Sequence, residues 1–242
     1  DGRFLVVWQR FGTGVVARVL DAAGVPQGRD IAITTSVAFG GLDLAINDKG
    51  RGLVIWTGDD GDYAGIFARR LRTNGMPRDA SFQVNTYTTG WQFRPRVASV
   101  RPLRFVVVWS DPGNRDGSEG AVVGQRINRV GSAIGGEFIV NSDTSGDQRY
   151  PDVVRGQGRE FVVVWEGGTP YGQTGPNGYT GFGARGIRAR GSKDRRGARA
   201  DPDVPDRGGR GPGRCSARAP ACGTTGGSSP WSASCGRSQG CC

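Results

Sequence analysis

The chain has 242 residues, enough for one all-β domain, and it contains 43 glycines, five cysteines and no histidine. Without histidine, Ser–His and Cys–His nucleophilic pairs are excluded, and no phosphate loop or dinucleotide fingerprint occurs in the sequence. The net charge of +10 comes almost entirely from arginine, interspersed with acidic residues over positions 1–190, so we expect no nucleic-acid partner. The only enzyme class left open uses paired carboxylates.

The first element in the chain is a short apolar phrase that ends in tryptophan, and it occurs four times. The phrases are Phe4–Trp8, Leu53–Trp56, Phe105–Trp109 and Phe161–Trp165, with tryptophans 48, 53 and 56 residues apart. Self-similarity at this period predicts a repeat architecture. The runs are apolar without alternation, which indicates strands buried on both faces.

Three further strand-length segments follow each phrase and are separated by turns rich in Gly, Asn and Asp. The second type is 14–20, 65–71, 120–127 and 181–187; the third is 30–33, 81–85 and 137–141; the fourth is 42–46, 94–98 and 150–154. Turns at Gly24, Gly75, Gly131 and Gly191 end the second type. Their composition is typical of strands and hairpins, and no window has helical periodicity.

Four strands in about 50 residues predict tandem four-stranded antiparallel repeats of an all-β fold. We interpret them as a partial β-propeller, because neighbouring blades cover an inner strand on both faces; a β-sandwich or stacked β-array is the alternative. The tryptophans Trp8, Trp56, Trp109 and Trp165 then form the repeat core instead of stacking on carbohydrate. Trp91 and Tyr87 lie outside the phrases and are better candidates for exposed aromatic contacts.

The combined pattern resembles a repeat of large bacterial secreted and surface proteins. It reads Gly-x-x-x-Gln-Arg, Glu-Phe-x-Val-Asn, Thr-x-x-x-Gln-x-x-Pro-x-Val-Ala and Phe-Val-Val-Val-Trp, and its clearest matches are 82–92, 95–98 and 120–150. The first unit departs from it, with Ile33-Thr34 in place of Val-Asn. The resemblance covers about residues 1–190 and implies an extracellular or cell-surface protein that often also carries adhesion or calcium-binding modules.

Two acidic loops that follow the tryptophan phrases are the candidate metal sites. Asp59, Asp60 and Asp62 form one set, and Asp111, Asn114 and Asp116 form the other. Hard oxygen ligands around a glycine turn are typical of calcium loops. The competing interpretation, which we favour, is that Asp, Asn and Gly close tight turns through their backbone preferences. We expect no other cofactor.

The composition changes at about residue 191, which divides a β-repeat domain (1–190) from a tail (191–242). The tail has one valine and no Phe, Ile, Leu, Met or Tyr, so we expect it to be disordered. All cysteines are found there: Cys215, Cys222, Cys235, Cys241 and Cys242. Their spacing fits no metal motif and their number is odd, which favours a frameshifted or artefactual tail over a metal site, a disulfide knot or a functional basic tail.

The chain begins inside a repeat, and a propeller needs more blades than three complete intervals supply, so we expect further repeats of the same chain to be missing. No long apolar stretch predicts membrane insertion. The sequence predicts a non-catalytic module, not an enzyme, that acts in adhesion or as a scaffold for an unknown surface ligand or carbohydrate. The alternative is a propeller-type carbohydrate-active enzyme with paired carboxylates, which carboxylates converging on one cleft would favour.

Overall fold

The computed structural model describes residues 2–36, 40–100, 104–157, 160–168 and 181–188. These residues belong to one compact unit, Asp1–Ser192. The predicted tail 191–242, its five cysteines and the turn at Gly191 lie outside the described residues. The domain boundary near residue 190 and the frameshift therefore stay predictions.

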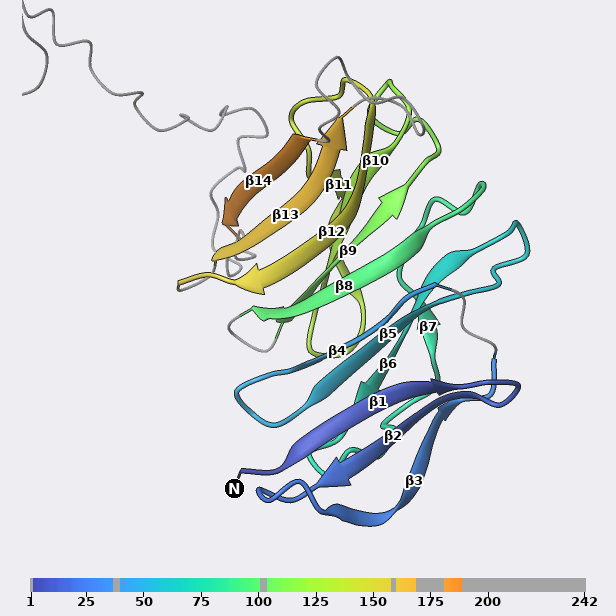
Figure 1. The fold of residues 1–242 in the computed structure, drawn as a ribbon, viewed down its shortest axis with the longest axis vertical. Coiled ribbons are helices and arrows are strands. Elements are labelled where there is room, and N and C mark those ends of the chain that lie inside the picture. Colours follow the sequence, from blue (N-terminus) through green and yellow to red (C-terminus); the bar gives the residue numbers. More distant parts are fainter. Residues whose placement is uncertain (1, 37–39, 101–103, 158–159, 169–180, 189–242) are drawn as a thin grey trace, which may run out of the picture. The chain divides into compact units, whose positions relative to one another are not determined.

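Fourteen strands in the described part form four antiparallel sheets in chain order (Figure 1). The first sheet contains β1 (Phe4–Arg10), β2 (Gly14–Leu20) and β3 (Pro26–Thr34). The second contains β4 (Leu42–Ile46), β5 (Gly52–Gly58), β6 (Gly65–Leu71) and β7 (Phe82–Gln83). The third contains β8 (Phe93–Val100), β9 (Arg104–Asp111), β10 (Ala121–Ile127) and β11 (Ala133–Ile139). The fourth contains β12 (Asp147–Arg155), β13 (Glu160–Gly168) and β14 (Gly181–Arg188).

The prediction of consecutive four-stranded antiparallel repeats is confirmed. The second and third sheets have four strands each, every one paired with its neighbour in the sequence. No helix in the described part is long and apolar enough to span a membrane. The hairpin turns predicted at Gly24, Gly75 and Gly131 have left-handed backbones, with φ of 80°, 79° and 90°, a conformation that favours glycine.

The tryptophan phrases occupy equivalent places in the four sheets. Each phrase lies on the strand that pairs with the second segment type of its repeat, the segment that begins with glycine. Trp8 is opposite Val16, Trp56 is opposite Phe67, and Trp109 is opposite Val123. Trp165 is opposite Gly183. Trp56, Trp109 and Trp165 are buried, whereas Trp8 is only partly buried. Burial on both faces, which the absence of alternation predicts, holds for β5 and β9, which lie in the two middle sheets, but not for β1 and β13.

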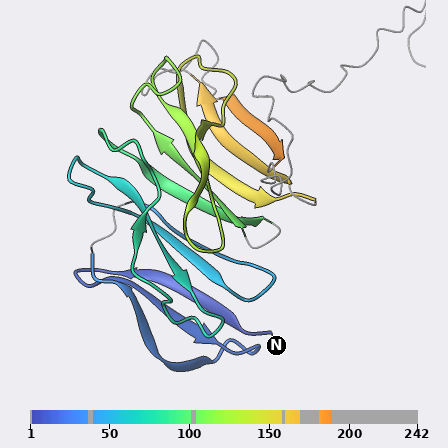
Figure 2. The ribbon, with the colours of Figure 1, turned by 180° about the vertical axis from the view of Figure 1, so that it is seen from behind.

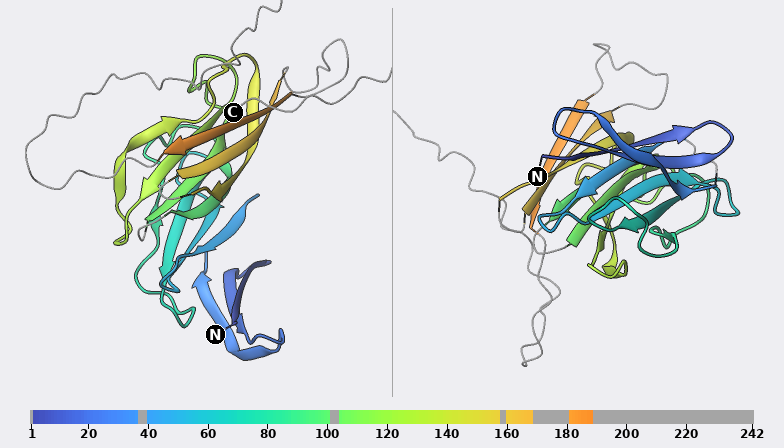
Figure 3. Two further views of the ribbon diagram at one scale, coloured as in Figure 1. Left: turned by 90° about the vertical axis from the view of Figure 1, so that its left-hand side faces the viewer. Right: turned by 90° about the horizontal axis from the view of Figure 1, so that it is seen from below.

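Successive sheets pack face to face through three apolar clusters, and this order of sheets can be followed from behind in Figure 2 and from the side in Figure 3. Trp56 packs against the first sheet with Val15 and Ala17. Trp109 packs against the second with Leu53. Trp165 packs against residues of the third. Each of these tryptophans therefore faces the sheet that precedes it in the chain.

Polar links also join the sheets at the rim where the chain passes from one to the next. Ala64 forms a parallel bridge with Trp91, and Gly120 forms one with Asp147. Each bridge connects the start of a third strand to the segment that enters the next sheet. The Tyr150 backbone N–H also donates to the Ser110 hydroxyl at 3.0 Å. These links fix the loops at this rim, where the candidate site lies.

Candidate functional site

The first acidic loop connects β5 to β6. Asp59 accepts a hydrogen bond from the backbone N–H two residues on, at 2.9 Å. Asp60 accepts from the Gln83 amide at 3.1 Å, and Asp62 accepts from the Gly90 backbone N–H at 3.1 Å. These carboxylates therefore close a turn or tie the loop to its neighbour.

The second acidic loop connects β9 to β10. Asp111 accepts from Arg115 at 3.1 Å, and its other oxygen accepts from the Gly113 N–H at 3.0 Å. Asn114 has a left-handed backbone with φ of 57°, and Asp116 accepts from the buried Asn141 amide at 2.6 Å. The polar side chains of this second loop therefore also stabilise turns or link the loop to neighbouring segments.

The structure does not bring the six candidate ligands together. Within the described residues, no group of three or more His, Cys, Asp or Glu side chains is arranged to hold a metal ion. The observed hydrogen bonds are those that Asp and Asn form in tight turns. Calcium binding stays a prediction.

A pocket of about 430 Å³ lies at the rim, where the entries to β8 and β12 meet the end of β9. Its volume is in the range of small-molecule sites. It combines aromatic, acidic and basic side chains from three separate segments of the chain. The lining residues are Trp91, Phe93, Arg94, Ser110, Asp111, Pro112, Glu119, Asp147, Gln148, Arg149 and Tyr150.

Two bulges shape this pocket. Arg94 and Tyr150 occupy equivalent positions just before a proline near the start of β8 and β12, where the strand register shifts. Both have left-handed backbones, with φ of 55° and 52°, which is unfavourable for bulky residues. The Arg94 guanidinium carbon lies 4.1 Å from the Tyr150 ring centroid, and that of Arg149 lies 5.1 Å from it. Backbone strain of this kind is concentrated at functional sites.

Three carboxylates line the pocket, and a ligand can reach two of them. The Glu119 residue is exposed, and the Asp147 side chain is 18% exposed and pairs with Arg149 at 3.3 Å. The Asp111 side chain is fully buried against Arg115. A Cβ on Gly120 would lie only 2.1 Å from the Asp147 carboxylate oxygen, so glycine beside Glu119 lets that carboxylate approach the backbone. Glu119 and Asp147 are thus the accessible acidic pair.

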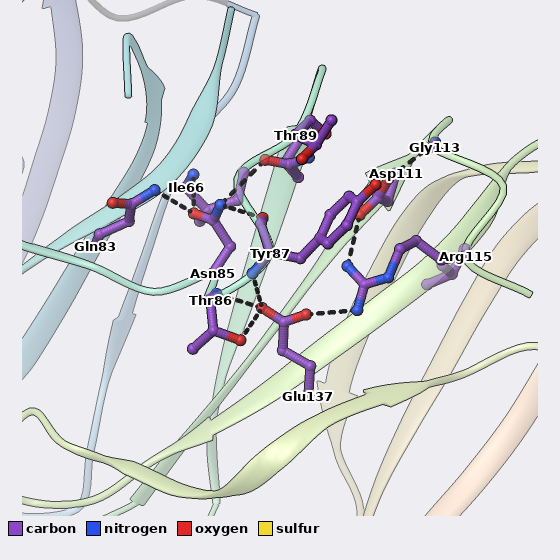
Figure 4. Close-up of polar contacts among 12 residues, drawn as sticks. Ile66, Gln83, Asn85, Thr86, Tyr87, Thr89, Asp111, Gly113, Arg115 and Glu137 are labelled. Carbon is purple, nitrogen blue, oxygen red and sulfur yellow. Dashed lines mark hydrogen bonds and ion pairs between the residues drawn. The ribbon is translucent and has the colours of Figure 1, made fainter. Parts of the chain in front are cut away.

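A part-buried polar network supports the pocket loops (Figure 4). The Glu137 carboxylate on β11 accepts from the Thr86 hydroxyl at 3.0 Å and the Tyr87 N–H at 3.3 Å. Arg115 donates to Glu137 at 2.8 Å and to Asp111 at 3.1 Å, and its guanidinium carbon lies 4.2 Å from the Tyr87 ring centroid. This network joins the loop that carries Trp91 to the loop that carries Glu119.

The two acids of the network differ in pKa. Burial raises the pKa of Asp111, although hydrogen bonds and charge from Gly113 and Arg115 oppose the change. Burial also opposes ionisation of Glu137, but the hydrogen bonds from Thr86, Arg115 and Tyr87 outweigh it and lower the pKa of that carboxyl. Glu137 is therefore held as a carboxylate that orders the loops around it.

A second group of polar residues lies on the first strands of the second, third and fourth sheets. Asp43, Arg96 and Asp152 occupy equivalent positions on β4, β8 and β12. Asp43 accepts from the Val97 N–H at 2.9 Å, and Arg96 lies 3.9 Å from Asp152. Burial raises the pKa of Asp43, opposed by the backbone hydrogen bonds that it accepts. None of the three lines the pocket, and their contacts join neighbouring sheets.

One pocket residue outside the acidic loops was predictable from the sequence, whereas most of the others were not. Trp91, singled out for an exposed aromatic contact, is 50% exposed and lines the pocket. Tyr87, the other candidate, is half-buried under Arg115. Arg94, Tyr150, Glu119 and Asp147 were missed. One available signal was the bulky residue directly before the proline of the fourth segment.

No family model matches the chain, and no curated protein matches it in sequence. The fold is similar to that of the GH93 alpha-L-arabinofuranosidase of Fusarium graminearum, solved with arabinobiose, with a TM-score of 0.52 and 15% identity over 77% of this chain and 59% of that one. It is also similar to a Dyadobacter fermentans protein of unknown function, with a TM-score of 0.51 and 15% identity over 78% of this chain and 50% of that one. The chain therefore spans between half and three-fifths of the length of these proteins.

These comparisons establish the fold and correct two predictions. The blades are those of a β-propeller, as the sequence predicts. The predictions of a non-catalytic adhesion or binding scaffold and of a chain that is not an enzyme are wrong, because a solved protein with this fold is a glycoside hydrolase. The physical reason for the error is that packing positions dominate a repeat sequence, whereas the pocket residues are dispersed between repeats.

Proposed function

We propose that this chain is part of a propeller-type carbohydrate-active enzyme that hydrolyses glycosidic bonds in the pocket between the third and fourth sheets. One observation carries the proposal: two solvent-accessible carboxylates, Glu119 and Asp147, line the same pocket, and the Gly120–Asp147 bridge joins the segments that carry them. A pair of carboxylates is what glycoside hydrolysis requires.

The two carboxylates have different surroundings and so suit different roles. Asp147 is held by Arg149 at 3.3 Å, which orients its oxygens. Glu119 is exposed and forms no ion pair with any described residue. We assign Glu119 as the acid that protonates the leaving oxygen. Asp147 then acts on the other side of the bond, on water or on the sugar carbon itself.

The remaining pocket residues suit a sugar. Arg94 and Arg149 present several N–H donors around Tyr150, and sugar hydroxyls and ring oxygens accept hydrogen bonds from such groups. The apolar faces of Phe93 and Pro112 lie in the same lining. Mixed polar and aromatic surfaces of this kind recognise small polar ligands.

The fold supports the same proposal. A propeller that carries a glycoside hydrolase activity is known from the fungal arabinofuranosidase, and the present chain spans about 59% of its length. We propose that further repeats of the same chain complete the propeller and that the protein acts outside the cell, where polymeric glycans occur.

The test is hydrolysis of a panel of oligosaccharides and aryl glycosides of arabinose, xylose, galactose and glucose by the complete protein with all of its repeats. Glu119→Gln and Asp147→Asn should each lower the rate by at least about 100-fold. Asp79→Asn, at a carboxylate outside the pocket, should retain the wild-type rate. Circular dichroism verifies that the variants fold. Wild-type protein that cleaves none of the substrates, or pocket variants with unchanged rates, would refute the proposal.

A further inference from the structure

Trp91 presents an exposed indole beside the pocket. Half of its surface is accessible, and it lines the pocket. Its ring stacks on Tyr63, with centroids 5.6 Å apart and planes 28° apart. Tyr63 is 64% exposed and is not part of the pocket lining. An exposed pair of stacked aromatic rings at the edge of a pocket is a surface suited to a ligand.

The two rings are held in place by their backbone. Tyr63 has a left-handed backbone with φ of 77°, and the Asp62 carboxylate accepts from the Gly90 N–H at 3.1 Å. The Gln92 N–H donates to the Ala64 carbonyl at 2.7 Å. The residues next to Tyr63 in the β5–β6 loop are therefore hydrogen-bonded to the residues next to Trp91 in the β7–β8 loop. A rigid aromatic surface loses little conformational entropy when a ligand binds.

We propose that Trp91, stacked on Tyr63, forms a sugar-binding subsite at the edge of the pocket, so that the ligand is an oligosaccharide that extends from the pocket towards the β5–β6 loop. This inference rests on the proposed function and adds the length of the substrate to it. One face of many sugar rings presents only C–H groups and packs on an indole, while the hydroxyls at its edge remain in water. The subsite is continuous with the pocket because Trp91 belongs to its lining.

The experiment measures binding of saccharides of one to five rings, from the four sugar series named above, to the full chain by calorimetry. In the series that binds, affinity should rise about tenfold when the chain becomes long enough to reach Trp91. Trp91→Ala should remove that gain, so it should weaken binding of the long ligands about tenfold more than binding of the shortest one, and Tyr63→Ala should reduce the gain. Phe11→Ala, which truncates an aromatic ring that is 97% exposed, is the matched control and should have no effect.

The outcomes separate this inference from the proposed function. If a glycan is bound and cleaved but its affinity is independent of length, or if Trp91→Ala weakens short and long ligands equally, the subsite is refuted and the hydrolase proposal stands. If no saccharide of any series binds or is cleaved, both proposals fail. Melting temperatures near that of the wild type exclude unfolding as the cause of a loss.

Discussion

At the scale of single residues, an asparagine after the last strand of the second and third sheets holds the segment that enters the next sheet. The Asn85 side chain accepts from the Ile66 N–H at 2.7 Å and donates to the Gln92 side chain at 3.0 Å. Asn141 forms the same bond to Gln148, at 3.1 Å, seven residues further along. The recurring Val-Asn and the glutamine after it therefore form one buried polar unit. Breaking these hydrogen bonds in a low-dielectric interior is costly, which explains why Val-Asn and the later glutamine recur together in the sequence.

Glu137 is the residue whose ionisation should affect stability most clearly. Its folded pKa is lowered from the ordinary value of 4.5, so its contribution is present above about pH 4.5 and is lost as the pH falls through the lower folded value. Glu137→Gln should lower the unfolding free energy at pH 7 by about 1–3 kcal/mol. The difference from wild type should shrink below pH 4.5. Urea denaturation at pH 7 and pH 3.5 measures both.

Glu119→Gln is the matched control, because it changes an exposed glutamate on the neighbouring loop. Its stability should equal that of the wild type at both pH values. A Glu137 variant that is equally destabilised at pH 3.5 and pH 7 would show that shape, and not charge, is what the network requires. A variant that is not destabilised at pH 7 would mean that the network does not order the loops.

At the scale of elements, the strands were predictable and the pocket was not. The segments 42–46 and 65–71 have the predicted bounds, because local apolar patterns and glycine turns define them. The third segment of the second unit is shorter than predicted, Phe82–Gln83 instead of 81–85. The strand ends early because the Ile66 N–H donates to the Asn85 side chain and not to a backbone carbonyl of the neighbouring strand. Side-chain competition of this kind has no periodic signal.

The pocket was not predictable for a related reason. It is assembled from 91–94, 110–119 and 147–150, which only the packing of two sheets brings together. Two of its residues, Arg94 and Tyr150, also have conformations that no propensity favours. Conflict between local preference and final structure is expected at functional sites.

The strained bulge at Arg94 gives a prediction at this scale. The left-handed backbone at Arg94 costs about 1 kcal/mol or more, and glycine adopts it without strain. Arg94→Gly should therefore leave the melting temperature unchanged or raise it. The same variant should weaken glycan binding, because the guanidinium over Tyr150 is lost. Ser99→Gly, later on the same strand without a left-handed backbone, should lower the melting temperature. A clear destabilisation by Arg94→Gly would show that the bulge is not strained.

At the scale of the whole molecule, the two terminal sheets expose faces that are buried in the sheets between them. Phe4 and Val6 are 56% and 44% exposed, although their counterparts Phe105 and Val107 are buried. In the fourth sheet Val154 and Val164 are 57% and 46% exposed. Repeats are stabilised by contacts with their neighbours, so terminal faces of this composition lack part of that stabilisation. They also form apolar patches that favour association.

We therefore expect the purified chain to associate as its concentration rises. The outward faces of the first and last sheets are different surfaces, so contact between them is head-to-tail and builds a closed ring or an open chain. The double variant Val6→Lys/Val164→Lys should reduce association, because it places a charge on both faces. Val25→Lys, which changes an exposed valine in the β2–β3 turn, should leave association unchanged. Sedimentation velocity over a range of concentrations measures the effect, and a wild-type chain that stays monomeric and unfolds in one sharp transition would contradict it.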